Sequence, residues 1–244
     1  MPTTAAGRYD RARFLLVSAI ALVTLLSWSW IIVMALDMYG SMTGASAWMM
    51  TPHWDAWHLL LLWAMWAVMM TAMMLPSTVP IVLLGGSDAH ALASGYIAVW
   101  AVFSVGATLL QWGLGQFLFL TPMMEASSAK VGGVFLLVAG LYQWTPLKRA
   151  CLTACQSPMA FLSRRWRSGG WGGFRTGVEH GVYCVGCCWA LMLLLFAGGV
   201  MNLWVIAGLT LFVGFEKLVP FGAASARFSG AVLVAAGAWM LFGV

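Results

Sequence analysis

The sequence predicts an all-α fold, a polytopic bundle of about seven transmembrane helices with one amphipathic helix at the cytoplasmic interface. Of the 244 residues, 62% are hydrophobic and only 8% are charged, whereas soluble domains carry about 25% charged residues. Several stretches reach the ~20 apolar residues that a helix needs to cross a bilayer. Because no polar stretch is long enough to bury a core of its own, we expect a single membrane domain over residues 1–244.

The apolar stretches define the expected spans in chain order. The first follows three arginines and lacks a small-residue cleavage site, so we expect a retained helix rather than a removed signal peptide. The second contains Pro76 and Pro80, which are expected to kink it or to end its membrane part early. The last two are short and are joined by a tight turn at 220–222. The expected spans are 13–36, 56–84, 90–120, 129–145, 172–198, 202–219 and 224–243.

The segment between the fourth and fifth spans is basic and amphipathic. Five lysines and arginines lie within 148–167, and apolar residues recur at three- and four-residue steps. This pattern is typical of an interfacial helix, expected over 147–166 with a break at Pro158. Basic residues in short loops stay on the cytoplasmic side, so this segment and the N-terminal arginines both predict a cytoplasmic N-terminus. The net charge of +5 therefore reflects membrane topology, and we expect no nucleic-acid partner.

The fifth span carries three cysteines and a histidine in the segment HGVYCVGCC. Residues three or four apart share a helix face, so His180, Cys184 and Cys187 project in nearly one direction, and Cys188 flanks them. Thiolate and imidazole are ligands for soft and borderline metals. We therefore predict a metal site at these four residues, for Cu(I) first and for zinc as the alternative. Simple packing of small buried thiols is the structural alternative.

The second span is rich in methionine, with five in the ten residues 65–74. Thioethers are soft neutral ligands that suit Cu(I), although methionine is also a common packing residue. At 1.5 Å per residue, this stripe and the cysteines both fall near the bilayer midplane, where they could face each other. Met69 and Met73 are expected to complete the cysteine site or to form its outer approach. The further candidates in this span are Met65, Met70 and His58.

The interfacial segment holds two further cysteines, Cys151 and Cys155, which are four residues apart. They could form a cytoplasmic docking pair for a metal ion, or they could simply belong to the apolar side of the helix. None of the five cysteines lies in a segment that we expect outside the cell. The sequence therefore argues against a disulfide framework and for thiols that are available to a metal or a redox partner.

Two ionisable groups lie in apolar segments, where a charge is costly unless it is paired. We predict an ion pair between Glu179 and Lys217. Glu216 is the alternative partner for a buried charge. Glu179 is also a candidate metal-site residue, since it could orient the adjacent His180.

Four motifs together resemble a bacterial family of integral membrane proteins that are predicted to bind metal. The motifs are MMTAMMLP at 69–76, YQWTPLK at 142–148, CLTAC at 151–155 and HGVYCVGCCWALM at 180–192, and the Glu216-Lys217 pair also fits. The resemblance extends over about 48–220. It implies a multi-pass protein of the bacterial inner membrane with a bound metal, and it implies no substrate or reaction.

These observations predict a protein that binds a soft metal, most favourably Cu(I), for transport, storage or delivery to a membrane enzyme. One alternative is a thiol–disulfide protein that passes electrons through the Cys184-x-x-Cys187 pair. A second alternative is an accessory subunit of a larger membrane metalloenzyme complex. The expected partners are the lipid bilayer, the metal ion and, in the second alternative, that complex. We assign no catalytic residue.

Overall fold

The computed structural model describes residues 3–40, 47, 55–219 and 221–243. These residues form an all-helical protein, and no β-strand occurs among them apart from an isolated bridge between Leu120 and Ala126. The all-α prediction is therefore confirmed. The predicted turn at 220–222 includes Pro220, which lies outside the described residues.

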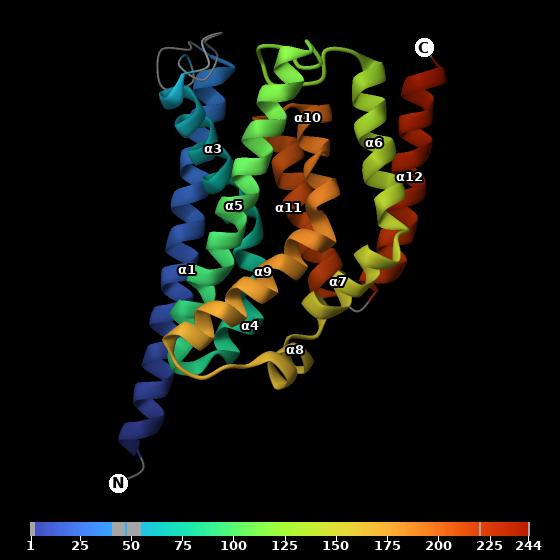
Figure 1. Ribbon diagram of the computed structural model, residues 1–244. Coiled ribbons are helices and arrows are strands. Elements are labelled where there is room, and N and C mark those ends of the chain that lie inside the picture. The colour runs from blue at the N-terminus through green and yellow to red at the C-terminus, as the bar shows by residue number, and fades with distance from the viewer. Residues whose placement is uncertain (1–2, 41–46, 48–54, 220, 244) are drawn as a thin grey trace.

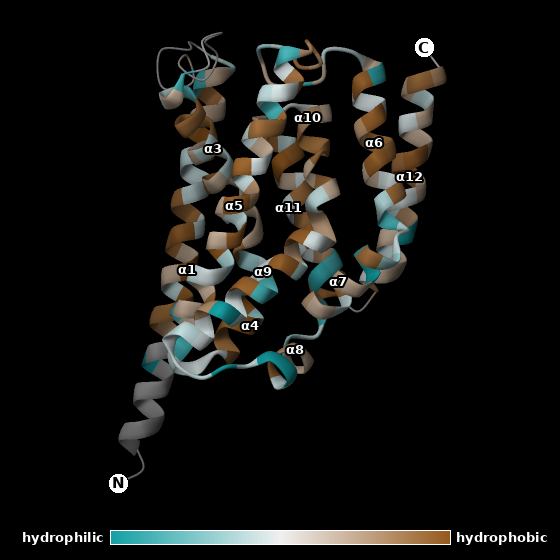
Figure 2. Ribbon diagram, viewed as in Figure 1, coloured by the Kyte–Doolittle hydropathy of each residue, from teal (hydrophilic) through white to brown (hydrophobic). Residues whose placement is uncertain are grey.

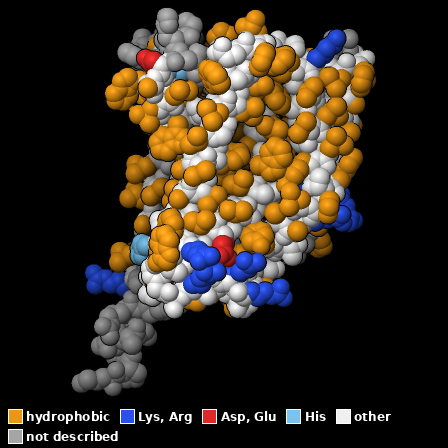
Figure 3. Space-filling model, in the orientation of Figure 1, with side chains coloured by type: hydrophobic (Ala, Val, Ile, Leu, Met, Phe, Trp, Pro, Cys, Tyr) orange, Lys and Arg blue, Asp and Glu red, His pale blue; other side chains and the backbone are white. Residues whose placement is uncertain are grey.

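Among the described residues, five helices are long and apolar enough to cross a membrane. Most of the helices run side by side, with α6 and α12 paired at one side of the bundle (Figure 1). Large apolar side chains cover much of the visible face, as expected for contact with lipid (Figure 3). The prediction of seven membrane spans and the prediction of a cytoplasmic N-terminus stay predictions. The five long helices are α1 (Thr3–Met38), α3 (Ala56–Met74), α5 (Ala89–Gln116), α9 (Gly170–Met192, continued by α10, Leu194–Gly198) and α12 (Gly222–Phe242). The apolar helices α6 (Ala129–Gln143) and α11 (Leu203–Leu218) are shorter.

The predicted break in the second apolar stretch is confirmed. The helix α3 ends at Met74, and Pro76 opens a 3₁₀ turn, η1 (Pro76–Thr78). The chain then resumes as the short helix α4 (Val79–Leu84) and a second turn, η2 (Gly86–Asp88). Proline has no backbone N–H to donate and clashes with the preceding turn, so a regular helix cannot continue through this segment.

The basic segment also breaks where the sequence predicts, because it forms α7 (Pro146–Gln156) and α8 (Pro158–Arg165) with Ser157 between them. Hydrophilic residues concentrate at this end of the bundle (Figure 2). The helix α7 does not lie wholly at the surface. Its residues Lys148, Cys151 and Leu152 are buried, and α7 packs against α9. This inward packing brings the α7 cysteines toward those of α9.

Two glycines allow α5 and α9 to cross in close contact. A Cβ atom added to Gly95 would lie 2.1 Å from the backbone oxygen of Phe174, and one added to Gly177 would lie 2.0 Å from that of Leu92. Small residues at helix crossings in membranes let backbones approach in this way. The crossing places Tyr96, on α5, beside Cys184 on α9.

Substitution of Gly95 by alanine is expected to lower the free energy of unfolding by roughly 1–3 kcal/mol, because the new methyl group would force the two backbones apart. Thermal unfolding of the detergent-purified variant measures this. Gly106→Ala is the control on the same helix, since nothing lies within 4 Å of its added Cβ. Equal midpoints for Gly95→Ala and Gly106→Ala would contradict the prediction.

Candidate metal centre

Cys184 is the centre of a buried polar group that three helices build. Its Sγ lies 2.9 Å from the Nζ of Lys217 on α11 and 3.0 Å from the hydroxyl of Tyr96 on α5. All three side chains are buried. The ammonium group of lysine has only donors, so the sulfur is the acceptor of its hydrogen bond. A thiolate at Cys184 would neutralise the charge that Lys217 carries into the apolar interior.

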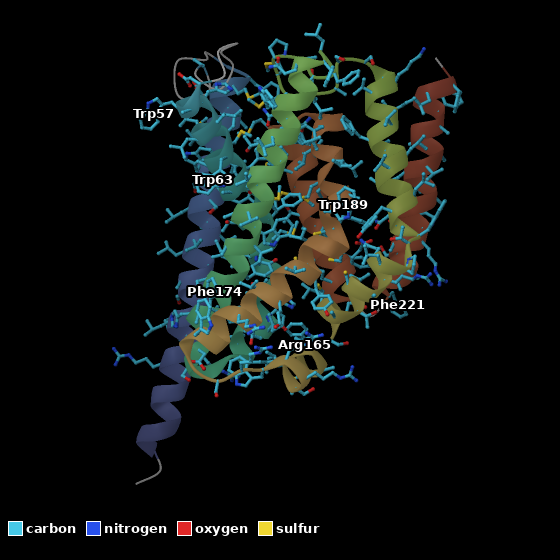
Figure 4. The ribbon with its side chains drawn as sticks, in the orientation of Figure 1. Trp57, Trp63, Arg165, Phe174, Trp189 and Phe221 are labelled. Carbon is cyan, nitrogen blue, oxygen red and sulfur yellow. The ribbon has the colours of Figure 1, made fainter. Side chains whose placement is uncertain are left out.

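The predicted ion pair between Glu179 and Lys217 is wrong. Glu179 and Cys184 are five residues apart on α9, so their side chains point about 140° away from each other. Glu179 lies partly exposed and faces a group of arginines at the α8 end of the bundle, where Arg165 is visible (Figure 4). The arginine nitrogens that approach its carboxylate belong to Arg165 at 3.4 Å, Arg167 at 3.5 Å and Arg175 at 3.8 Å.

A second contact joins the two cysteine motifs. The Sγ atoms of Cys155 on α7 and Cys187 on α9 are 4.0 Å apart. Two sulfurs bound to one ion at about 2.3 Å each lie at most about 4.6 Å apart, so this spacing fits a shared ion. Hydrogen bonds with the thiols of Cys184 and Cys187, together with burial, raise the pKa of the Cys155 thiol well above its usual value. This shift favours the protonated thiol of Cys155 at neutral pH.

The remaining thiols take different positions. The Sγ atoms of Cys187 and Cys188 donate to the backbone oxygen of Cys184 at 3.1 and 3.0 Å. Cys151 packs its sulfur against the backbone of Gly186, and burial raises the pKa of its thiol. All five cysteines are free. Within the described residues no three His, Cys, Asp or Glu side chains are already arranged to hold a metal ion.

His180 lies beside the thiols with an unsatisfied nitrogen. Its Nδ1 is buried and has no hydrogen-bond partner among the described residues. Its ring centroid lies 5.9 Å from that of Tyr96 and 5.2 Å from that of Phe161. The side chain lines a cavity of about 160 Å³ that Cys155 and Lys217 also line. A buried polar atom without a partner is rare in proteins. This nitrogen is therefore suited to receive a ligand or a neighbouring donor.

The methionines of α3 are buried, as a stripe facing other helices requires. Met65, Met69, Met70, Met73 and Met74 belong to the same core as the cysteines of α9. Among these five methionines, Met74 contacts the polar group around Cys184, since its Sδ lies 3.4 Å from the Nζ of Lys217. Met74 belongs to the methionine stripe predicted from the sequence, but it was not among the predicted metal ligands.

The predicted roles of Met69 and Met73 as ligands stay predictions. His58 lies in the first turn of α3 and donates its backbone N–H to the side chain of Asp55. At 1.5 Å per residue, His58 is about 24 Å along the helix axis from Met74. It therefore cannot share an ion with Met74.

A buried ion pair that sequence reasoning missed lies next to this group. The Nζ of Lys148 on α7 lies 2.6 Å from the Oε2 of Glu216 on α11, and their side chains are 0% and 1% exposed. Gln143 donates to the other carboxylate oxygen at 3.1 Å, and Gln156 donates to the backbone oxygen of Glu216 at 2.7 Å. The pair joins α6, α7 and α11, and it fixes the position of Lys217, the next residue.

The comparisons with known proteins give one finding. The model of a family described as a copper chaperone, PpoB2, matches residues 63–240. The match includes all five cysteines, Met74 and Lys217, and it begins after His58. Curated proteins and solved structures give no match.

Proposed function

The chain belongs to the copper chaperone family PpoB2, and from this premise we propose that it binds Cu(I) as cargo through buried thiols and passes the ion to another protein. The observation that carries the proposal is the Cys155–Cys187 pair, with sulfurs 4.0 Å apart beside Cys184. A bare cation is unstable in hydrocarbon unless ligands replace its water. Thiolates are the soft ligands that select Cu(I).

The surroundings of the pair support binding and release. Cys155 lines the cavity at the α7–α8 end. The buried Lys217 and the exposed Leu218 line it as well, so the cavity reaches from the interior toward the surface. An incoming ion would therefore meet Cys155 first and then the thiols of α9. The family description favours copper and gives no support to zinc.

The positions of the basic residues suggest the side from which copper arrives. Lys and Arg side chains gather at the α8 end of the molecule (Figure 3), and the positive-inside rule places such residues in the cytoplasm. We propose that copper enters from the cytoplasmic side and that the receiving protein docks at this end or within the membrane.

Anaerobic titration of the reduced, detergent-purified protein with Cu(I) tests the proposal. We expect one tightly held ion per chain, an X-ray absorption spectrum dominated by sulfur neighbours, and loss of binding after alkylation of the thiols. Binding no greater than that of the alkylated protein, or a first shell of nitrogen and oxygen, would refute it.

The thiol–disulfide alternative gives a different result in the same samples. The sulfurs of Cys155 and Cys187 must approach from 4.0 Å to about 2.05 Å to form a disulfide. Counting free thiols under mild oxidation and after reduction measures whether this bond forms reversibly. A reversible disulfide in a protein that takes up no copper would favour that alternative.

A further inference from the structure

The ammonium group of Lys217 is surrounded by side-chain groups that could also bind a metal cation. Its Nζ contacts the Sγ of Cys184 at 2.9 Å, the Sδ of Met74 at 3.4 Å and the Oγ of Ser77 at 3.4 Å. These three groups come from α9, α3 and η1. Thiolate and thioether are ligands that bind Cu(I) better than they bind an ammonium group. The lysine therefore fills a sulfur-rich position that suits copper.

No carboxylate of the described residues forms an ion pair with Lys217. Glu216 is its neighbour in the chain, but the carboxylate of Glu216 is held by Lys148 and Gln143. A buried charge needs a partner, and for Lys217 that partner is the sulfur of Cys184. A copper ion bound by both this sulfur and the sulfur of Met74 would therefore compete with the ammonium group, which contacts both.

We infer that Cys184 and Met74 form an inner copper position, and that the ammonium of Lys217 occupies it while copper is absent. The inference rests on the proposed function and adds a second position beyond the Cys155–Cys187 pair. Two positive charges cannot share one position, so copper enters only when the ammonium leaves. The free energy of that displacement is subtracted from the affinity for copper. Lys217 thus keeps copper exchangeable, which a protein that hands on its cargo requires.

The displaced ammonium group has a place to go. Lys217 lines the cavity of about 160 Å³, and His180 lines it as well. The Nδ1 of His180 is buried and has no hydrogen-bond partner in the part of the chain that the structure describes, so it can accept a hydrogen bond from the displaced ammonium. Lys217 can therefore vacate the inner position without entering the lipid.

Lys217→Leu removes the ammonium without adding a ligand. We expect the purified variant to bind Cu(I) at least about tenfold more tightly than the wild type, a change of about 1.4 kcal/mol, in competition with a chromophoric Cu(I) chelator. It should also release copper to the chelator more slowly. The matched control is Lys217→Arg, which keeps a cation at this position and should stay within a few-fold of the wild type. Equal or weaker binding by Lys217→Leu would overturn the inference, because a lysine that merely stabilised the bound complex would give that result.

A measurement on the wild type covers the case in which Lys217→Leu fails to fold. The chain has three lysines, of which Lys130 is exposed and Lys148 is buried in its ion pair. Reductive methylation followed by mass spectrometry should show that copper increases the labelling of Lys217 severalfold. Lys130 should be labelled and Lys148 protected in both states. Unchanged labelling of Lys217 in a protein that binds copper would overturn the inference alone, whereas a wild type that binds no copper would refute the proposed function with it.

Discussion

Replacement of Cys155 and Cys187 together by serine is expected to abolish tight binding of Cu(I). The two sulfurs lie 4.0 Å apart and come from different helices, so the double change removes the thiol contact between α7 and α9 that carries the proposed site. Serine keeps the size of the side chain but offers a hard oxygen in place of a soft sulfur. Since even outer-shell partners are worth about 10–100-fold in metal affinity, we expect a loss of more than about hundredfold in a competition titration with a Cu(I) chelator.

Cys151→Ser is the matched control. Cys151 lies one turn earlier on the same helix, but its sulfur packs against the backbone of Gly186. Its loss should leave both the stoichiometry and the affinity for copper within a few-fold of the wild type. Retention of copper by the double variant, or an equal loss in Cys151→Ser, would show that the ion is held elsewhere.

Lys148→Met is expected to destabilise the fold by roughly 3–5 kcal/mol, the typical effect of removing one partner of a buried ion pair. The carboxylate of Glu216 would keep its hydrogen bond from Gln143 but would lose the ammonium that neutralises it. An uncompensated negative charge would then remain buried between α7 and α11. Unfolding of the purified protein by SDS in mixed micelles, followed by tryptophan fluorescence, measures the difference.

Two variants make the measurement specific to the ion pair. Arg149→Met changes the neighbouring exposed charge and should alter stability by no more than about 0.5 kcal/mol. Lys148→Met combined with Glu216→Gln removes both charges and should recover part of the stability. A single variant Lys148→Met as stable as the wild type would contradict the assignment.

Local rules predicted much about single segments. The proline pair explains the end of α3 and the turn that follows it, and Pro158 marks the break between α7 and α8. The burial of the methionine stripe and of the α9 cysteines also follows from helical spacing in apolar segments. In each case, the physical cause acts within a few residues of the chain, so one sequence is sufficient.

These local rules could not predict which side chains meet between helices. The sequence suggested that Lys217 pairs with Glu179, whereas the fold pairs it with Cys184. Sequence reasoning also treated Lys148 as a loop charge, although α7 turns inward and buries it against Glu216. Which neighbour a side chain meets depends on the rotation and the crossing of whole helices, and no local pattern encodes either.

By itself the sequence determined the helical membrane class, the breaks at proline and the sulfur-rich faces of two segments, because backbone geometry and apolar length act locally along the chain. Only the tertiary structure decided that Cys155 meets Cys187 and that Lys217 lies between Cys184 and Met74. Close crossing of α5 and α9 through glycines, and the inward packing of α7, bring together groups that are distant in sequence. The proposed copper site depends on those approaches, since its ligands come from several helices.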